Sequence, residues 1–476
     1  MTRKSNLYLG GSWVPTDRHF SVSDPANHRV VGSVADADPT HAIRAIEAAH
    51  SAFAEWSKTP APQRSALLYK WHRLILDHCD EIASLLTSEM GKPLPEAKGE
   101  VVFAANFVLW YAEEAKRING ETLPANERNK RITVLRQPVG VVAAITPWNF
   151  PAAMVTRKVA PALAAGCTVI LKPAEQTPLT AIRLIELAEQ AGFPPGVLNL
   201  LTTSDPAAVG DVLTTDARVR KITFTGSTEV GKLLYRKAAD SVKRISLELG
   251  GHAPFIVFED ADLDQAVTGV ILSKYRNAGQ TCICTNRVYV QSSIAERFAE
   301  KLAGAVGKLQ VGDGRLEGVQ IGPLIDERAL EKVERHVEDA LSKGATVLSG
   351  GSRVDSPGYF FQPTVLGGVT ESMQIATEET FGPVAPIFTF ESEGEVLARA
   401  NDTPYGLAAY FYTREIGRIT RMQEGLDYGI IGVNDPAPSL AIQAPFGGFK
   451  ESGLAREGGK YGLDAFLETK YISLAF

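Results

Sequence analysis

Residues 139–171, VGVVAAITPWNFPAAMVTRKVAPALAAGCTVIL, contain two short apolar runs on either side of a helical stretch. Val139–Ile145 and Thr168–Leu171 have the length and residue types of buried strands, and Ala153–Ala165 has apolar residues at helical spacing. A strand, a helix and a second strand in this order form a parallel crossover unit. This stretch therefore predicts an α/β fold built on a parallel sheet.

The alternation of strands and helices continues on the C-terminal side. Helical patterns at 179–191, 207–213 and 230–238 alternate with strand-like runs at 197–201, 222–225 and 245–249. A second set begins near Pro254, with strand-like runs at 255–258 and 288–290 and helical patterns at 265–275, 295–306 and 330–341. We therefore expect two Rossmann-like parallel-sheet lobes with a cleft between them.

The two ends of the chain differ from this alternation. Helical patterns occur at 42–56, 66–86 and 101–115, and a charged stretch, 126–131, separates them from an extended run, 132–145. Phe466–Phe476 is strand-like and has no helical partner. Such a terminal strand needs a sheet edge to pair with, in this chain or in another subunit.

Composition limits the classes of function. The chain has 476 residues, of which 45% are hydrophobic and 22% charged, and its formal net charge is −6. We expect no nucleic-acid partner, because the net charge is negative. We expect no membrane partner, because no stretch approaches the about 20 consecutive apolar residues of a membrane span. Residues 1–10 lack the apolar run of a secretory signal, and four cysteines suit a reducing compartment, so we expect a cytoplasmic protein.

A glycine turn follows the predicted strand 222–225. Its sequence, Gly226-Ser-Thr-Glu-Val-Gly-Lys232, resembles a phosphate-binding loop, but Leu233 stands where a nucleotide hydrolase needs Ser or Thr. Backbone N–H groups at the start of a helix favour an anion such as pyrophosphate. A plain turn with Ser227 as the helix N-cap explains the same residues.

Three side chains have the chemistry of covalent catalysis. Cys282 is a candidate thiolate nucleophile, and the alternatives are a buried structural cysteine or half of a metal site. Glu248, at the end of an apolar strand, is either a general base or a satisfied strand-end carboxylate. Asn149 is either an oxyanion donor or a turn residue between two prolines. Because HExxH, paired CxxC and GxSxG motifs are absent, we expect no metal site and no α/β-hydrolase chemistry.

Taken in order along the chain, the motifs resemble those of the aldehyde dehydrogenase superfamily. They are Pro147-Trp-Asn-Phe-Pro151, Leu171-Lys-Pro-Ala-Glu-Gln-Thr-Pro178, Phe224-Thr-Gly-Ser227, Glu248-Leu-Gly-Gly251, Gly279-Gln-Thr-Cys282, Glu378-Glu-Thr-Phe-Gly-Pro383 and Pro445-Phe-Gly-Gly448. The resemblance extends from about Leu7 to the C-terminus and is specific, because seven motifs occur in register. Because of this resemblance, we favour a catalytic role for Cys282 over a purely structural one.

The resemblance implies a mechanism. Cys282 would attack the aldehyde carbon, and Asn149 with the backbone N–H of Cys282 would hold the oxyanion of the thiohemiacetal. Hydride transfer to a nicotinamide would leave a thioester, which water activated by Glu248 would hydrolyse. The cofactor contacts that the resemblance implies are Trp148, Lys172, Glu175, Gly226, Ser227, Glu379 and Phe381.

Within the superfamily the chain is most similar to succinate-semialdehyde dehydrogenases, in residues 152–158, 253–258 and 273–284. Arg157 and Arg276 match the two carboxylate-binding arginines of that subfamily, and a guanidinium fork suits the far carboxylate of a four-carbon semialdehyde. Ser439 corresponds to its carboxylate-binding serine. However, residues 434–443 form a loop about one residue longer than usual and rich in proline, so glutarate semialdehyde or a neutral aliphatic aldehyde are the alternative substrates.

Two further expectations concern the cofactor and a thiol pair. Lys172 and Glu175 would bind the adenosine ribose, and because the Glu175 carboxylate would repel a 2′-phosphate, we expect NAD in preference to NADP. Some relatives with the Cys282-Ile-Cys284 sequence form a reversible disulfide that blocks the nucleophile. Cys284 is therefore either a redox partner or a passive thiol.

The resemblance also implies a domain organisation. We expect a cofactor-binding domain at 1–116 and 139–249, a catalytic domain at 250–450, and an oligomerisation element at 117–138 and 451–476 that makes a homodimer or homotetramer. A rival from another class is a non-catalytic homologue that retains only the fold. The intact set of Cys282, Glu248 and Asn149 argues against that rival.

Overall fold

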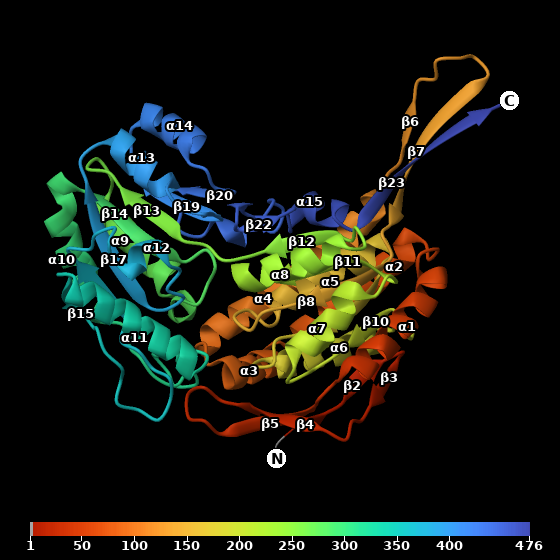
Figure 1. Ribbon diagram of the computed structural model, residues 1–476, viewed down its shortest axis with the longest axis horizontal. Helices are drawn as coiled ribbons and strands as arrows, with labels where there is room; N and C mark the ends of the chain where they lie inside the picture. The colour runs from red at the N-terminus through yellow and green to blue at the C-terminus, as the bar shows by residue number, and fades with distance from the viewer. Residues whose placement is uncertain (1–2) are drawn as a thin grey trace.

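The structure is a computed structural model that describes residues 3–476 of the chain. Two expectations include Met1 and Thr2, namely the cofactor-binding domain that begins at residue 1 and the lack of a secretory signal in residues 1–10. For these two residues both expectations lie outside the described range. Two lobes and a projecting arm make up the molecule (Figure 1). None of the helices in the described part combines the length and apolar character that crossing a bilayer requires.

The first lobe is built on an eight-stranded sheet with the order β22-β12-β11-β8-β9-β10-β2-β3. Strands β12 to β10 in this order are parallel, and the three outer strands, β22 on one side and β2 and β3 on the other, are antiparallel to their neighbours. The strands are β2 (Leu7–Leu9), β3 (Ser12–Val14), β8 (Val141–Ile145), β9 (Thr168–Lys172), β10 (Leu198–Leu200), β11 (Val219–Thr225), β12 (Arg244–Glu248) and β22 (Gly453–Leu454).

Helices cover both faces of this sheet because its strands are apolar on both sides. Val142 and Ala144 of β8 pack with the helices of one face, whereas Val141, Ala143 and Ile145 pack with those of the other. The first face carries α2 (Ala61–Asp77), α3 (Cys79–Met90), α4 (Leu94–Glu114), α5 (Ala153–Ala165) and α6 (Pro178–Ala191). The second carries α1 (Pro39–Trp56), α7 (Pro206–Thr215) and α8 (Thr228–Ala239).

The second lobe is built on a seven-stranded sheet with the order β15-β16-β17-β14-β13-β19-β20, parallel except for β15 at one edge. Its strands are β13 (Ala253–Val257), β14 (Thr285–Gln291), β15 (Thr346–Ser349), β16 (Thr364–Gly367), β17 (Val384–Phe390), β19 (Ala408–Tyr412) and β20 (Ile430–Val433). Its helices are α9 (Leu263–Lys274), α10 (Ala295–Val306), α11 (Glu327–Ser342), α12 (Gln374–Thr377), α13 (Glu393–Asn401) and α14 (Ile416–Gly425). The α/β class and the two parallel-sheet lobes are confirmed.

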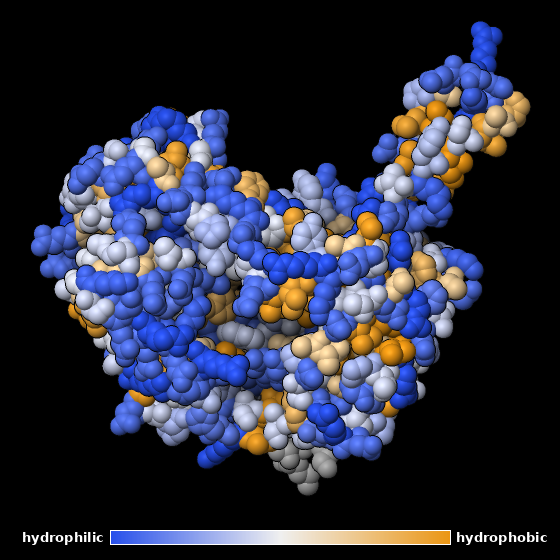
Figure 2. Space-filling view, in the orientation of Figure 1, coloured by the Kyte–Doolittle hydropathy of each residue, from blue (hydrophilic) through white to orange (hydrophobic). Residues whose placement is uncertain are grey.

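The arm is a three-stranded antiparallel sheet of β6 (Glu121–Leu123), β7 (Lys130–Pro138) and β23 (Leu467–Ala475). The terminal strand β23 pairs with β7 along nine residues, so its partner edge lies in the same chain. The arm extends away from both lobes and carries apolar side chains among hydrophilic ones (Figure 2). Its exposed apolar residues are Leu123, Leu135, Tyr471, Ile472 and Leu474.

Several smaller elements complete the fold. A small sheet joins β1 (Arg3–Ser5), β4 (His19–Ser23) and β5 (Val30–Ala35), and β18 (Tyr405–Gly406) pairs with β21 (Phe449–Lys450). The helix α15 (Gly459–Asp464) contacts α5 and α4 of the first lobe, and β22 lies in the sheet of that lobe. We therefore propose that the oligomerisation element begins at β23 and that the preceding part of 451–476 belongs to the first lobe.

Two predicted elements are wrong in detail. The helical stretch 66–86 is two helices, because the chain leaves helical geometry at His78 between α2 and α3. The extended run 132–145 is two strands in different sheets, because Gly140 with φ of 130° breaks the run.

Candidate active site

A cavity of about 350 Å³ lies between the two lobes. The order of the first sheet reverses between β8 and β11, and ligands of α/β sheets bind where strand order reverses, beyond the carboxyl ends of the strands. Residues that directly follow these two strands line the cavity from one side, and the second lobe supplies the other side. Seven predicted site residues meet there, namely Trp148, Asn149, Gly226, Ser227, Cys282, Glu379 and Phe381.

A second cavity of about 470 Å³ adjoins the first and shares Trp148, Gly226 and Ser227 with it. Lys172, at the end of β9, and Glu175 line its far part, together with apolar residues of α7 and α8. Both cavities have sizes typical of cofactor sites. A cofactor whose one end reacts at Cys282 and whose other end reaches Lys172 and Glu175 therefore fits the residues present.

Cys282 follows a tight turn, Arg276–Gly279, in which Asn277 and Ala278 have φ of 54°, and it lines the cavity from the second lobe. The loop packs tightly, because a Cβ atom at Gly251 would come within 2.3 Å of the Cys282 carbonyl oxygen. Burial, with the carboxylates of Glu379 and Glu248 nearby, raises the pKa of the Cys282 thiol to about 12. The thiol therefore carries its proton at neutral pH, and attack requires a base or a positive charge beside it.

Asn149 lies directly beyond β8 and is buried. Its side-chain Nδ2 donates a hydrogen bond to the Gln280 carbonyl at 3.0 Å, which ties it to the loop of Cys282. An amide nitrogen carries two N–H groups, so one remains to donate to an oxygen in the cavity. Asn149 and the candidate nucleophile thus line the same cavity, with one amide N–H available to a ligand there.

Glu248 is the last residue of β12 and is not among the residues that line the cavity, although its carboxylate interacts electrostatically with Cys282. It is buried, and neither of its carboxylate oxygens has a hydrogen-bond partner in the described part of the chain. Desolvation and the nearby Glu457 carboxylate raise the pKa of Glu248 well above its usual value. A carboxyl group with a raised pKa and free oxygens is suited to take a proton from water. A Cβ at Gly447 would come within 2.9 Å of Glu248 Oε1, so a glycine is needed beside it.

The predicted cofactor residues have distinct contacts. Lys172 is buried and its Nζ lies 3.4 Å from Glu175 Oε2, while the rings of Trp148 and Phe381 meet edge-on at 5.5 Å. Ser227 Oγ accepts a hydrogen bond from Val230 N at 3.3 Å, so it is the N-cap of α8. This cap leaves other N–H groups of the first turn for an anion.

Glu379 lines the cavity from the second lobe. Its Oε1 accepts a hydrogen bond from Gly251 N at 3.0 Å, and burial raises its pKa to about 7. Among the described residues, no group of three or more His, Cys, Asp or Glu side chains is placed to hold a metal ion.

The predicted substrate residues lie outside the lining of both cavities. Arg157 of α5 is buried, with its Nε 3.0 Å from Glu457 Oε2 and its guanidinium 3.7 Å from the centre of the Phe446 ring. Arg276 is half-buried, and within residues 3–476 its guanidinium has no ion pair, lying 5.4 Å from the centre of the Phe150 ring. Ser439 is half-buried in a 3-10 turn, Pro438–Leu440. Arg276 is therefore the arginine of the pair that forms no ion pair within 4 Å, although the Glu96 carboxylate interacts with it electrostatically.

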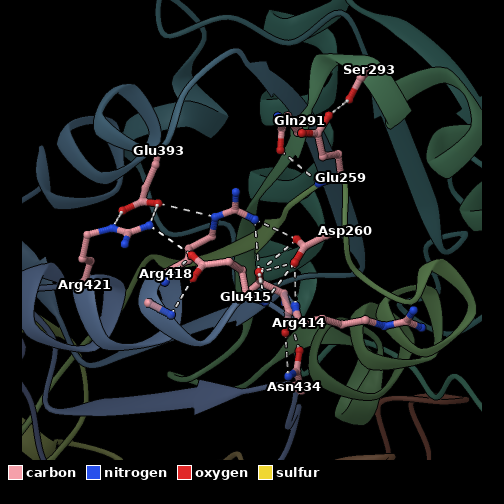
Figure 3. Close-up of polar contacts among 12 residues, drawn as sticks. Glu259, Asp260, Gln291, Ser293, Glu393, Arg414, Glu415, Arg418, Arg421 and Asn434 are labelled. Atoms are coloured by element: carbon pink, nitrogen blue, oxygen red, sulfur yellow. Dashed lines mark hydrogen bonds and ion pairs between the residues drawn. The ribbon is translucent and has the colours of Figure 1, made fainter.

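A polar network fixes the start of the loop that carries Ser439 (Figure 3). Asn434 follows β20 with φ of 52°, and its amide group bonds both the N–H and the carbonyl of Thr413, at 3.1 and 3.0 Å. Asp260 accepts hydrogen bonds from Thr413 Oγ1, Arg414 N and Arg418 Nη1, all within 2.9 Å. The first residue of the loop is therefore held to the residue that follows β19.

The two thiols of Cys282 and Cys284 are free. Cys284 is fully buried, and its Sγ donates to the Lys274 carbonyl at 3.5 Å. Burial raises the pKa of this thiol as well. A reversible disulfide between the two residues stays a prediction.

The motifs did not indicate two basic residues of the cavity. Arg328 and Lys332 line it from α11, and Lys332 Nζ donates to the Glu379 carbonyl. Their spacing of four residues places them on one face of the helix. That spacing is also typical of solvated surface charges, so the sequence alone carries no signal that separates the two roles.

The chain belongs to the aldehyde dehydrogenase family, whose model matches residues 13–472. It is therefore an NAD(P)-dependent oxidoreductase of small aldehydes, and the recognition based on the seven motifs is confirmed.

Individual relatives cover nearly the whole chain. The chain is 53% identical to a glutarate-semialdehyde dehydrogenase of Pseudomonas putida over 474 residues, 99% of this chain and 98% of the relative. It is 53% identical to an NADP(+) succinate-semialdehyde dehydrogenase of Escherichia coli over 477 residues, again 99% and 98%. The crystal structure of succinate-semialdehyde dehydrogenase from Burkholderia pseudomallei matches with a TM-score of 0.98 at 52% identity, over 99% and 98% of the two chains.

Proposed function

We propose that this protein oxidises succinate semialdehyde to succinate with NAD. The observation that carries the proposal is the cavity between the lobes, where Cys282, the Asn149 amide and the candidate cofactor residues converge. Relatives of about the same identity include enzymes named for succinate and for glutarate semialdehyde, and these names support an aldehyde with a distal carboxylate. The experiment that tests the substrate compares a semialdehyde with a neutral aldehyde.

The proposed reaction proceeds on Cys282. Its Sγ, after losing its proton, attacks the aldehyde carbon, and the carbonyl oxygen becomes an oxyanion that accepts hydrogen bonds from Asn149 Nδ2 and the Cys282 N–H. When bound, NAD supplies the acceptor for the hydride that leaves this carbon. The remaining thioester on Sγ is hydrolysed by a water molecule whose proton Glu248 accepts, and the products are a carboxylate and the free thiol.

Arg276 is the proposed anchor for the distal carboxylate of the substrate. It forms no ion pair within 4 Å in the described part of the chain, although the buried Glu96 carboxylate interacts with it electrostatically, and it lies six residues before the nucleophile. Arg157 is the second proposed anchor, although Glu457 already lies against its guanidinium. A substrate carboxylate at Arg276 would gain a charge-assisted hydrogen bond, which contributes about 1.5–3 kcal/mol.

We therefore expect Arg276→Ala to lower kcat/KM for succinate semialdehyde about 10- to 150-fold, at 1.36 kcal/mol per tenfold. The same variant should lose less than about threefold with butyraldehyde, which has no carboxylate to bind. Steady-state kinetics with both aldehydes measure this difference. Arg297→Ala, on the exposed face of α10, is the matched control and should change neither value. Equal losses on both aldehydes would refute the anchor role.

A second candidate substrate is glutarate semialdehyde, which has one more methylene group. The named relative from Pseudomonas putida and the longer loop at 434–443 favour it. One methylene changes binding by about 1–3 kcal/mol in a fitted pocket. The relative kcat/KM values of the two semialdehydes decide between the candidates.

We also propose that NAD is preferred to NADP. The supporting feature is the Glu175 carboxylate, which lies at the far cavity beside Lys172 and would accept a hydrogen bond from a ribose hydroxyl but repel a 2′-phosphate. The Escherichia coli relative is named for NADP(+), so family membership alone does not decide this preference.

The expected preference for NAD is about tenfold or more in kcat/KM. Repulsion of about 1 kcal/mol between unit charges 4 Å apart in water, and more near a protein surface, accounts for this factor. In Glu175→Gln, which keeps the shape and removes the charge, the preference should shrink. Steady-state kinetics with both cofactors test this, and equal efficiency of the wild type with NAD and NADP would contradict it.

We further propose a homodimer or homotetramer in the cytoplasm. The exposed apolar residues of the arm support assembly, because such a surface is stabilised when a second subunit covers it. The free cysteines and the need for a reduced Cys282 support a reducing compartment.

A further inference from the structure

Three charged residues recur at a spacing of four where α4 begins. They are Lys92, which lies just before the helix, and Glu96 and Glu100, which share one face of it because they are four residues apart. Lys92 and Glu100 form an ion pair whose side chains are 1% and 2% exposed. No motif of the sequence analysis includes them.

Both members of the pair bind the backbone of the turn that carries Asn149. Lys92 Nζ donates to Glu100 Oε2 and, at 2.9 Å, to the carbonyl oxygen of Asn149. Glu100 Oε1 accepts hydrogen bonds from Ala152 N at 2.9 Å and Ala153 N at 3.2 Å, at the start of α5. The ion pair therefore holds this turn at both ends of residues 149–153.

The same face of α4 also holds the loop of the nucleophile. Glu96 Oε2 accepts a hydrogen bond from Asn277 N at 2.9 Å, and Asn277 Nδ2 donates to the Asn149 carbonyl at 3.1 Å and to the Gln280 carbonyl at 3.3 Å. Asn277 has φ of 54°, an unfavourable conformation that its surroundings maintain. One polar cluster thus fixes the turn of Asn149 against the loop that ends at Cys282.

A contribution to folding stability is a weak explanation for this cluster. Burying two charges costs desolvation energy that their mutual attraction barely repays, and apolar replacements of buried pairs are often neutral or stabilising. An oxyanion donor, in contrast, must lie within a few tenths of an ångström of its ideal place. A rigid ion pair bound to the backbone on both sides of Asn149 meets that requirement.

We propose that Lys92 and Glu100 are positioning residues that place the Asn149 amide for the oxyanion formed at Cys282. This inference rests on the proposed function only in that an aldehyde reacts at Cys282, and it holds for any aldehyde. Lys92 and Glu100 act through Asn149, so their contribution to the reaction rate requires its side chain.

A double-mutant cycle tests this requirement. The clamp variant combines Lys92→Met with Glu100→Gln, so that no buried charge is left unpaired and the glutamine can still accept from the N–H groups of α5. The clamp variant is compared with the wild type, both of which retain Asn149. The clamp variant that also carries Asn149→Ala is compared with the Asn149→Ala single variant. The rate of reduced-cofactor formation in the first turnover is measured with succinate semialdehyde and with butyraldehyde. The matched control combines Lys98→Met with Asp80→Asn, which removes an exposed ion pair between α4 and α3.

We expect the clamp variant to slow the first turnover about tenfold or more when Asn149 is present, and less than about twofold when it is absent. The KM for the cofactor should stay unchanged, and the control should match wild type in both backgrounds. Loss by the same factor in both backgrounds, or no loss in either, would overturn the proposal.

Two further comparisons keep the test decisive. If the clamp variant does not fold, Lys92→Arg retains the charge but displaces the donor, and the same dependence on Asn149 is expected. The coupling should be equal for both aldehydes, because both form the oxyanion. A lack of preference for succinate semialdehyde would contradict the proposed substrate, whereas additive losses with either aldehyde would contradict the positioning role.

Discussion

Cys282→Ala is expected to lower kcat/KM for every aldehyde by about 10⁴-fold or more, since loss of a covalent nucleophile removes the whole reaction path. Reduced-cofactor formation by the purified variant measures this loss. Cys79→Ala, which replaces a cysteine of α3 far from the cavity, is the control and should stay within about twofold of wild type. A Cys282→Ala enzyme that retained more than a few per cent of activity would show that another group forms the covalent bond or that none is formed.

Glu248→Gln is expected to separate the two halves of the reaction. Thioester formation does not need a base for water, so the first turnover should produce about one reduced cofactor per active site. Steady-state turnover should then fall about 10²- to 10⁴-fold, the usual contribution of a general base. The isosteric amide fits because Glu248 is buried and its oxygens have no hydrogen-bond partner within residues 3–476.

Rapid mixing followed by mass spectrometry measures this second effect. The variant should show a burst of reduced cofactor and an acyl group retained on Cys282. A variant with neither burst nor adduct would place Glu248 in the first half-reaction, and a variant with normal steady-state turnover would exclude it from hydrolysis.

Local sequence pattern predicted the elements of the parallel sheets well. The helix at Ala153–Ala165 has the predicted bounds, because apolar spacing ends where Gly166 takes a left-handed conformation. The break at His78 was not predicted, since the residues on both sides have continuous helical spacing. The small sheet of β1, β4 and β5 was also missed, because its short, half-exposed strands depend on pairing between distant segments rather than on a periodic pattern.

For the site, too, the sequence predicted what depends on local pattern and not what depends on contacts between distant residues. Residues such as Trp148 and Gly226 could be placed because each directly follows a strand, and strand ends meet at one edge of the sheet. Pattern could not indicate that Glu457 pairs with Arg157, because the two residues are 300 positions apart and meet only in the folded chain. It could not indicate the raised pKa of Cys282 either, because that depends on burial and on Glu379 and Glu248.

The measurement that tests the central claim most directly is kcat/KM of the reduced protein with NAD, for succinate semialdehyde beside butyraldehyde. The proposed carboxylate anchors, Arg276 and Arg157, predict a preference of about a hundredfold or more for succinate semialdehyde, about 2.7 kcal/mol at 1.36 kcal/mol per tenfold. Turnover of both aldehydes with little preference would contradict succinate semialdehyde as the substrate. The protein would still be an aldehyde dehydrogenase, and the loop at 434–443 would be the next segment to test for substrate contact.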